Sequence, residues 1–186
     1  MKKILSFLLC VLMIFSFCAC GKKAAEAPKE PSEFLPKTFY YYNNNLSLGM
    51  VTLNPDKIFS GEYKEYRADA TGDNYKNGTM YVSTFTGRFE EIKKMNDYSY
   101  LLTLDDVGTG QKKGTERIEN DLRYYSIEAV GFTDSGVFML YTPDTPIENL
   151  PKEFLKQWPK KDNKKLKTLS CYAIMNMATK KGYFSD

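Results

Sequence analysis

The sequence predicts a mainly β domain, an antiparallel meander that closes into a lipocalin-like barrel or a sandwich, with one short helix near residues 146–158. Two observations lead to this fold class. From Thr38 onward, apolar and polar residues alternate in short runs separated by turn residues, which is the pattern of half-buried strands. Aromatic residues make up 15% of the chain, and aromatic side chains are enriched in strands. We expect a barrel because closure removes the free strand edges that promote aggregation.

Two strands joined by a turn open the predicted domain. One face of the first strand is formed by Leu46, Leu48 and Met50. The sequence "NPDK" at 54–57 turns the chain into a second strand, one face of which is formed by Phe59, Gly61 and Tyr63. The polar segment 70–78 is predicted to be a loop, and it ends in Asn-Gly, a pair that favours tight reversal.

Two longer strands follow. The face of the first is formed by Tyr81, Ser83, Phe85, Gly87 and Phe89, and we expect a bulge or bend at the glycine. The turn "MNDY" at 95–98 leads into a strand whose face is formed by Tyr98, Tyr100, Leu102 and Leu104. The segment 105–113 is predicted to be a flexible loop.

The C-terminal part combines strands with the short helix. Strands are predicted at Leu122–Val130 and Val137–Thr142. The helix begins at 145–148 (Thr-Pro-Ile-Glu), because Thr can cap it, Pro suits its first position and Glu follows the Thr by three residues. Trp158 is expected to pack as a plug near its end. The last strand covers Thr168–Met177 and carries apolar residues on both faces.

The N-terminal residues 1–19 are predicted to be a signal peptide. Lys2 and Lys3 precede an apolar run from Ile4 to Phe17, which is the pattern of an export signal. The alternative is a transmembrane helix. The run is shorter than the roughly 20 apolar residues that span a bilayer, which favours the signal peptide.

The segment Phe17-Cys18-Ala19-Cys20 resembles a bacterial lipobox, in which an apolar residue, a small one and Gly or Ala precede a lipidated cysteine. Cys20 fits that position, whereas Cys18 would follow the bulky Phe17 where a small residue is required. The resemblance implies transfer of diacylglycerol to the Cys20 sulfur, cleavage after Ala19 and acylation of the new amino group by a fatty acid such as palmitate. Two acyl chains hold a protein to a membrane where one chain is marginal.

These observations divide the chain into three parts. A signal peptide covers 1–19, the lipidated cysteine and a disordered linker cover 20–36, and a single β-rich domain covers 37–186. The linker is polar and is interrupted by prolines, which suits an unpacked spacer. A disulfide between Cys20 and Cys171 is the alternative to lipidation, but Cys171 lies in an apolar run and is expected to be a buried small hydrophobe.

Three blocks of sequence resemble a module of lipoproteins and secreted proteins of low-GC Gram-positive bacteria. They are "NGTMYVSTFTGRFEEIKKMNDYSYLLTL" (77–104), "FMLYTPDTPIENLPKEFLKQW" (138–158) and "CYAIMNMATKKGYF" (171–184). The resemblance implies an extracytoplasmic β-rich domain on the outer face of the cell membrane. It implies no particular catalytic or binding residue.

Composition argues against several classes of function. The chain contains no histidine, which removes the commonest general base and zinc ligand and every Ser-His or Cys-His nucleophile pair. Lysine and arginine total 26 against 23 acidic residues, and without the two leader lysines the balance is 24 to 23, which gives no support for nucleic-acid binding. We therefore expect a protein that is not an enzyme, with no cofactor, no metal and no nucleic-acid partner.

One enzymatic alternative is a carboxylate-dependent hydrolase of the cell envelope, because glycoside hydrolysis needs two acids that flank a cleft. The paired acids of this chain are Glu90/Glu91, Asp105/Asp106 and Glu119/Asp121. Adjacent residues of a strand point to opposite faces, so neither adjacent pair can form such a site by itself.

Two surface features are candidates for binding. Five lysines fall within eight residues, and they could contact anionic headgroups or cell-wall phosphates: Lys160, Lys161, Lys164, Lys165 and Lys167. The alternative is a solvated loop, because screening cancels such attraction beyond roughly 10 Å. The tyrosines at 40–42 could stack on sugars or belong to ordinary sheet packing.

The leading hypothesis is therefore a membrane-anchored extracytoplasmic lipoprotein. Its non-catalytic β-domain is expected to bind a small ligand, an envelope component or a protein partner. The alternatives are the hydrolase and a structural or assembly protein.

Overall fold

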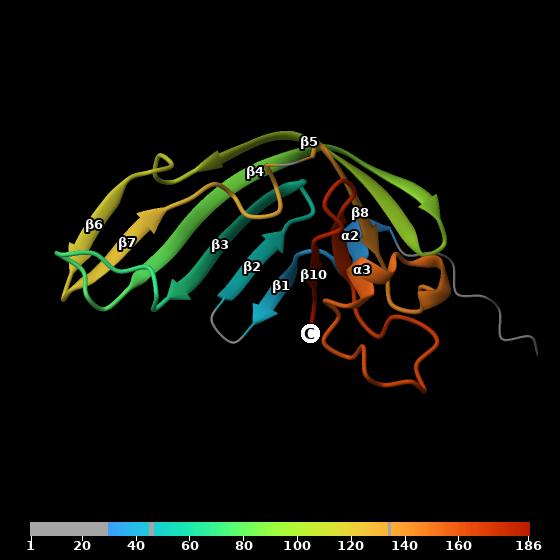
Figure 1. The fold of residues 1–186 in the computed structure, drawn as a ribbon. Coiled ribbons are helices and arrows are strands. Elements are labelled where there is room, and N and C mark those ends of the chain that lie inside the picture. The colour runs from blue at the N-terminus through green and yellow to red at the C-terminus, as the bar shows by residue number, and fades with distance from the viewer. Residues whose placement is uncertain (1–29, 45–46, 134) are drawn as a thin grey trace, which may run out of the picture.

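The computed structural model describes residues 30–44, 47–133 and 135–186 (Figure 1). Eight strands close into an antiparallel barrel, and two further strands extend from its longest strand. The order around the barrel is β3-β2-β1-β10-β9-β8-β5-β4, and β4 pairs with β3 to close it. The predicted mainly β class and the closed barrel are confirmed.

The strands are β1 Lys37–Asn44, β2 Ser47–Leu53, β3 Ile58–Arg67, β4 Thr79–Asn96, β5 Ser99–Thr109, β6 Glu116–Glu119, β7 Leu122–Ser126, β8 Val137–Tyr141, β9 Ala173–Asn176 and β10 Gly182–Phe184. The helical turns are α2 Pro31–Phe34, η1 Ile147–Asn149 and α3 Lys152–Leu155. The sequence does not predict β6 and β10, which are too short to show alternation. Strand β5 continues to Thr109, into the segment predicted as a loop, because it pairs there with β4.

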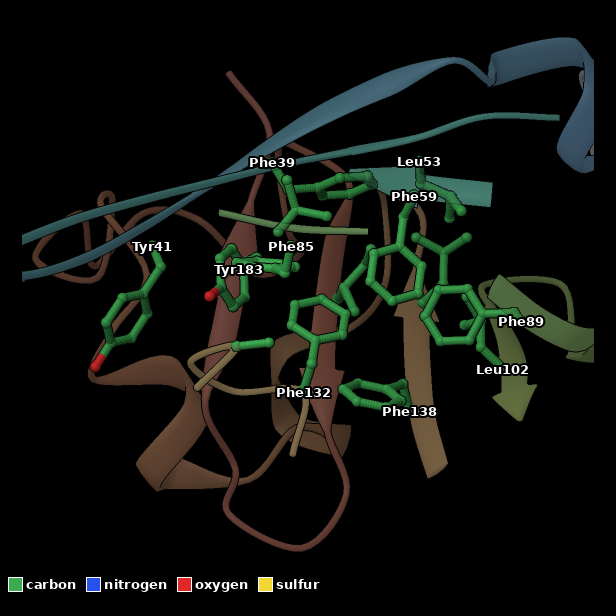
Figure 2. Close-up of a cluster of buried hydrophobic side chains, with 14 of the residues drawn as sticks. Phe39, Tyr41, Leu53, Phe59, Phe85, Phe89, Leu102, Phe132, Phe138 and Tyr183 are labelled. Carbon is green, nitrogen blue, oxygen red and sulfur yellow. The ribbon is translucent and has the colours of Figure 1, made fainter. Parts of the chain in front are cut away.

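The interior of the barrel is filled by aromatic rings (Figure 2). Phe132 comes from the segment between β7 and β8, is 1% exposed and lies at the centre of this cluster. Its ring centroid lies 4.8 Å from that of Phe59, 5.1 Å from that of Phe138 and 5.4 Å from that of Phe85. The interior is therefore a packed core and not a ligand cavity.

The first predicted strand is present as β2, but the predicted face is wrong. The residues of β2 that face the core are Ser47, Gly49, Val51 and Leu53, whereas Leu48 is 44% exposed. A side chain at position 49 would meet the rings of the barrel, because an added Cβ would lie 3.2 Å from Tyr183 Cε1. The rings that fill the barrel thus select the face that carries the glycine.

Gly87 lies at a close approach of the backbone to Phe59, and the predicted bulge follows one residue later, between Arg88 and Phe89. The side chains of Ser83, Phe85 and Phe89 are buried on the predicted face. A Cβ at Gly87 would lie 2.4 Å from Phe59 Cζ and 2.5 Å from the carbonyl oxygen of Asp106. Register shifts begin directly after Arg88, so the strand curls around the barrel at this point.

A second core covers the outer face of β8, β9 and β10. It is formed by Leu150, Phe154, Trp158, Leu169, Cys171, Ala173, Met175 and Phe184. Strand β9 is buried on both faces, as predicted, because it lies between the two cores. Cys171 is free and buried, and burial raises the pKa of its thiol.

The helix predicted near 146–158 consists of two short turns, η1 and α3, with Pro151 between them. Thr145 does not cap the first turn with its side chain. Its hydroxyl instead donates hydrogen bonds to the carbonyl oxygens of Thr142 and Tyr98, at 2.7 and 3.2 Å. The sequence pattern thus locates the helical segment correctly. The Thr145 hydroxyl does not cap it, because it bonds to backbone carbonyl oxygens of neighbouring residues instead.

The folded domain begins earlier than the predicted boundary at residue 37. Residues 31–34 form α2, in which Glu30 and Glu33 make a reciprocal capping box. The ring of Phe34 stacks on Tyr172 with the ring centroids 4.7 Å apart, and Leu35 is buried. The end of the predicted disordered linker therefore packs on the barrel, because its apolar Phe-Leu pair outweighs the prolines around it.

Strands β6 and β7 continue the sheet beyond the barrel (Figure 1). With residues 62–67 of β3 and 79–84 of β4 they form what we call the arm. Strand β7 runs parallel to β4 and pairs with its first residues, Thr79 to Val82. Strand β1 begins directly after α2, beside the end of β2, whereas the end of β3 pairs with the start of β4. The arm and α2 therefore lie at opposite ends of these strands.

Replacing Phe132 by Ala is expected to lower the free energy of unfolding by about 3–5 kcal/mol, because it leaves a cavity among rings that cannot collapse onto each other. Tyr98→Ala is the matched control, since Tyr98 is 42% exposed and should change stability little. Chemical denaturation of the variants measures both effects. Equal stability of the two variants would show that the interior does not depend on Phe132.

Gly87→Ala is expected to destabilise the protein by about 1–3 kcal/mol, because the added methyl group overlaps Phe59 and backbone. Gly108→Ala serves as the control, since a Cβ there meets no atom within 4 Å, and its effect should stay below about 1 kcal/mol. Thermal and urea unfolding would compare the variants. The predicted close approach is refuted if Gly87→Ala is as stable as Gly108→Ala.

Candidate functional site

One face of the arm carries a cluster of partly exposed tyrosine and charged side chains. It consists of Glu65, Arg67, Tyr75, Tyr81, Arg123 and Tyr125, and we call it the tyrosine face. Tyr81 and Tyr125 are register partners in the β4–β7 pair, and Tyr81 lies opposite Glu65 in the β3–β4 pair. Tyr81, Ser83 and Phe85 are spaced two residues apart on β4 and therefore point to the same side. The tyrosine face thus continues the inner face of the barrel.

Arg123 is at the centre of the tyrosine face. Its guanidinium carbon lies 4.4 Å from the ring centroid of Tyr75 and 5.4 Å from that of Tyr125. Its Nε donates to Thr79 Oγ1 at 3.2 Å, and its Nη1 lies 3.7 Å from Glu116 Oε2. These contacts fix the rings and the cation in one arrangement, which is the geometry of a cation–π cluster.

Glu65 is the anion of the tyrosine face. Its carboxylate accepts hydrogen bonds from Tyr63 Oη at 2.8 Å and from Arg67 Nε at 2.6 Å. Burial raises the pKa of Glu65, but the hydrogen bonds from Arg67 and Tyr63 outweigh burial, so the pKa lies below its usual value. The group is therefore a carboxylate at neutral pH and is not suited to act as a general acid.

Three tyrosines close the end of the barrel beside the arm. The ring of Tyr41 lies 5.5 Å from that of Tyr183 and 6.3 Å from that of Tyr63, measured between centroids. Tyr183 donates its hydroxyl to the carbonyl oxygen of Val130 at 2.6 Å. Burial raises the pKa of all three hydroxyls, so they remain neutral donors at physiological pH.

A hollow of about 330 Å³ lies on this face, lined by Glu65, Arg67, Asp69, Ala70, Tyr81 and Ile127. Aromatic rings, hydroxyls and fixed charges together can pack against an apolar ring face and hydrogen-bond to hydroxyl groups. The arrangement suits recognition of a polar ligand that has flat apolar patches.

The predicted lysine cluster lies in the loop between α3 and β9. All five lysines are exposed, and Lys161 Nζ donates to the carbonyl oxygen of Lys156 at 2.9 Å. Lys167 also lines a groove of about 600 Å³ beside Ile147, Leu150 and Lys152. The loop is thus a solvated basic surface that lies beside an apolar groove.

The acid pairs are not brought together into a cleft. The six carboxylates of Glu90/Glu91, Asp105/Asp106 and Glu119/Asp121 are all exposed. Across the described ranges, no three His, Cys, Asp or Glu side chains form a group that could hold a metal ion. Within the same part of the chain, none of the helices is long and apolar enough to span a bilayer. Cys20 and Ala19 lie outside the described residues.

Sequence reasoning missed most of the tyrosine face. Tyr81 belongs to a predicted strand face, but Arg123 and Tyr125 meet it only through the parallel β4–β7 pairing. The alternation of these two residues within Leu122–Ser126 is the only local signal for them. Tyr75 comes from a loop, and no pattern places it beside Arg123.

Comparison of the chain with protein-family models, with curated proteins and with solved structures found no match.

Proposed function

We propose that the protein is an extracytoplasmic lipoprotein, anchored through Cys20 to the outer face of the cell membrane, whose domain binds a glycan component of the envelope. The proposal is that binding occurs on the tyrosine face and that the domain does not catalyse a reaction. The apolar N-terminal run and the lipobox resemblance at 17–20 support the anchor. The geometry of the arm supports the binding role.

The observation that carries the binding proposal is the Arg123 cluster. The C–H faces of sugar rings are apolar and can pack on the rings of Tyr75, Tyr81 and Tyr125, while hydroxyl groups can bond to Arg123 and Glu65. Because Phe132 fills the barrel, a ligand has to bind on the outside of the domain. The partly exposed rings of Tyr75, Tyr81 and Tyr125 offer an aromatic surface for this purpose.

The position of the arm is consistent with a tethered binding domain. The chain enters the fold at α2, and the arm lies at the other end of the barrel strands. A tether that approaches α2 would therefore leave the tyrosine face at the far end of the domain, directed away from the membrane and toward the wall.

The lysine loop is proposed as an accessory contact. Its five exposed lysines could be attracted to anionic headgroups or wall phosphates, at about 1 kcal/mol each when close to the surface. The attraction falls off within roughly 10 Å, so it would act only on a surface that the tether already holds near. The exposed acid pairs do not favour the hydrolase alternative.

Binding to insoluble cell-wall glycan can be measured by co-sedimentation of the full-length chain in a detergent that has no sugar headgroup. Tyr125→Ala is expected to weaken binding by about 5-fold or more, because truncating a central tyrosine of an interface often costs over about 1 kcal/mol. Tyr98→Ala, an exposed tyrosine at the other end of the barrel, should bind as the unchanged chain does. Circular dichroism of each variant would check folding, and Arg123→Gln provides a second substitution in the cluster. Absence of binding, or equal binding by all variants, would contradict the role of the tyrosine face.

Cys20→Ser is expected to abolish lipid attachment, because the serine hydroxyl cannot replace the thiolate that accepts diacylglycerol. Cell fractionation and intact-mass analysis would then find protein without acyl mass and no longer held by a lipid anchor. Cys18→Ser is the control and should leave both the acyl mass and the membrane fraction unchanged. Unmodified Cys20 in the native protein would refute the anchor without bearing on glycan binding.

A further inference from the structure

The sheet divides where the barrel meets the arm. One edge of β4 pairs with β3, and its other edge pairs first with β7 up to Val82 and then with β5 from Phe85 onward. The flanking hydrogen bonds run from Ile127 N to Val82 O at 2.9 Å and from Gly110 N to Thr84 O at 2.8 Å. Between these two bonds β5 and β7 separate and leave a crevice, and ligand sites are usually concave.

A pocket of about 270 Å³ occupies this fork, and we call it the fork pocket. Its lining includes the polar residues Thr84, Gln111 and Thr115, together with Tyr124. Pockets for drug-sized ligands usually have volumes of roughly 300 Å³ or more. The fork pocket is slightly smaller, so it suits a small ligand about the size of a single sugar ring. Thr84 is three residues from Tyr81 on β4, and Tyr124 is adjacent to Tyr125 on β7, so both side chains point away from the tyrosine face. The pocket therefore opens mainly on the opposite face of the sheet.

Several polar groups of the fork pocket are available to a ligand. Gln111 uses its Oε1 to accept a hydrogen bond from Ser126 Oγ at 2.7 Å, which leaves both amide N–H donors. The hydroxyl of Thr84 lies on the exposed side of β4, whereas the buried hydroxyl of Ser83 lies on the inner side with Phe85 and is not directed into the pocket.

The charges at the rim of the fork pocket are already paired. Lys64 Nζ lies 3.1 Å from Glu62 Oε2, and Arg117 forms an ion pair with Glu119. The guanidinium of Arg117 also lies over the ring of Tyr124, 4.2 Å from its centroid. The pocket therefore presents neutral donors and acceptors beside a flat aromatic wall, and it does not present an unpaired charge that would select an ionic ligand.

We propose that the fork pocket is a second binding site, for a single neutral sugar unit. Its hydroxyls would bond to Gln111, Thr84 and Thr115, and one ring face would lie toward Tyr124. The site is separate from the tyrosine face and does not depend on the function proposed above.

Saturation-transfer difference NMR tests the proposal with the full-length chain in a zwitterionic detergent that has no sugar headgroup. The probes are glucose, galactose and N-acetylglucosamine, with glycine and glutamate as small polar molecules that are not sugars. At least one sugar is expected to receive saturation and the two amino acids none. Binding of an amino acid without any sugar would overturn the ligand class, and absence of all signals would overturn the site.

Thr84→Val locates the binding. It removes one hydroxyl without changing shape and is expected to raise the Kd of the bound sugar about 5-fold, the effect of one lost hydrogen bond. Thr86→Val is the matched control, since Thr86 is an exposed threonine two residues along the same strand and does not line the pocket. Equal Kd values for these two variants would show that the sugar does not bind in the fork pocket. If Tyr125→Ala abolishes monosaccharide binding and Thr84→Val does not, the sugar binds on the tyrosine face instead.

Discussion

The packing of Phe132 inside the barrel is the interaction on which the rest of the structure depends. Four aromatic rings from four strands surround it, so one side chain determines which faces of β3, β4, β8 and β10 point inward. The segment that carries Phe132 enters the barrel directly after β7. The same segment thus fills the interior with Phe132 and bonds through Ile127 N to Val82 O of β4. The packing of the core and the position of the arm are therefore linked.

Because the interior is occupied, the surfaces that could take up a ligand are those that the barrel supports and does not enclose. The arm is such a surface, since β4 is long enough to take part in both the barrel and the arm. Its two faces differ in chemistry. One has Arg123 between tyrosine rings, and the other has a small polar crevice at the fork of the sheet.

The alternating runs were sufficient to predict the fold class, the positions of β3, β4 and β8 and the apolar character of β9 on both faces. They failed at β2, where the larger residues Leu48 and Met50 marked the wrong face, because the space at Gly49 is decided by rings from distant strands. They failed in the same way at the candidate sites. Arg123 meets Tyr75 through a loop and a parallel pairing, and neither leaves a periodic signal in the chain.

The opposite placement of α2 and the arm also has a mechanical consequence. If the chain is held at its N-terminal end while a partner pulls on the arm, the load passes along the axes of β1 to β4. The ladder bonds between these strands are then strained together in shear and are not opened one after another. A long continuous β4 is suited to carry tension between a held N-terminal end and a partner bound to the arm, if both are present.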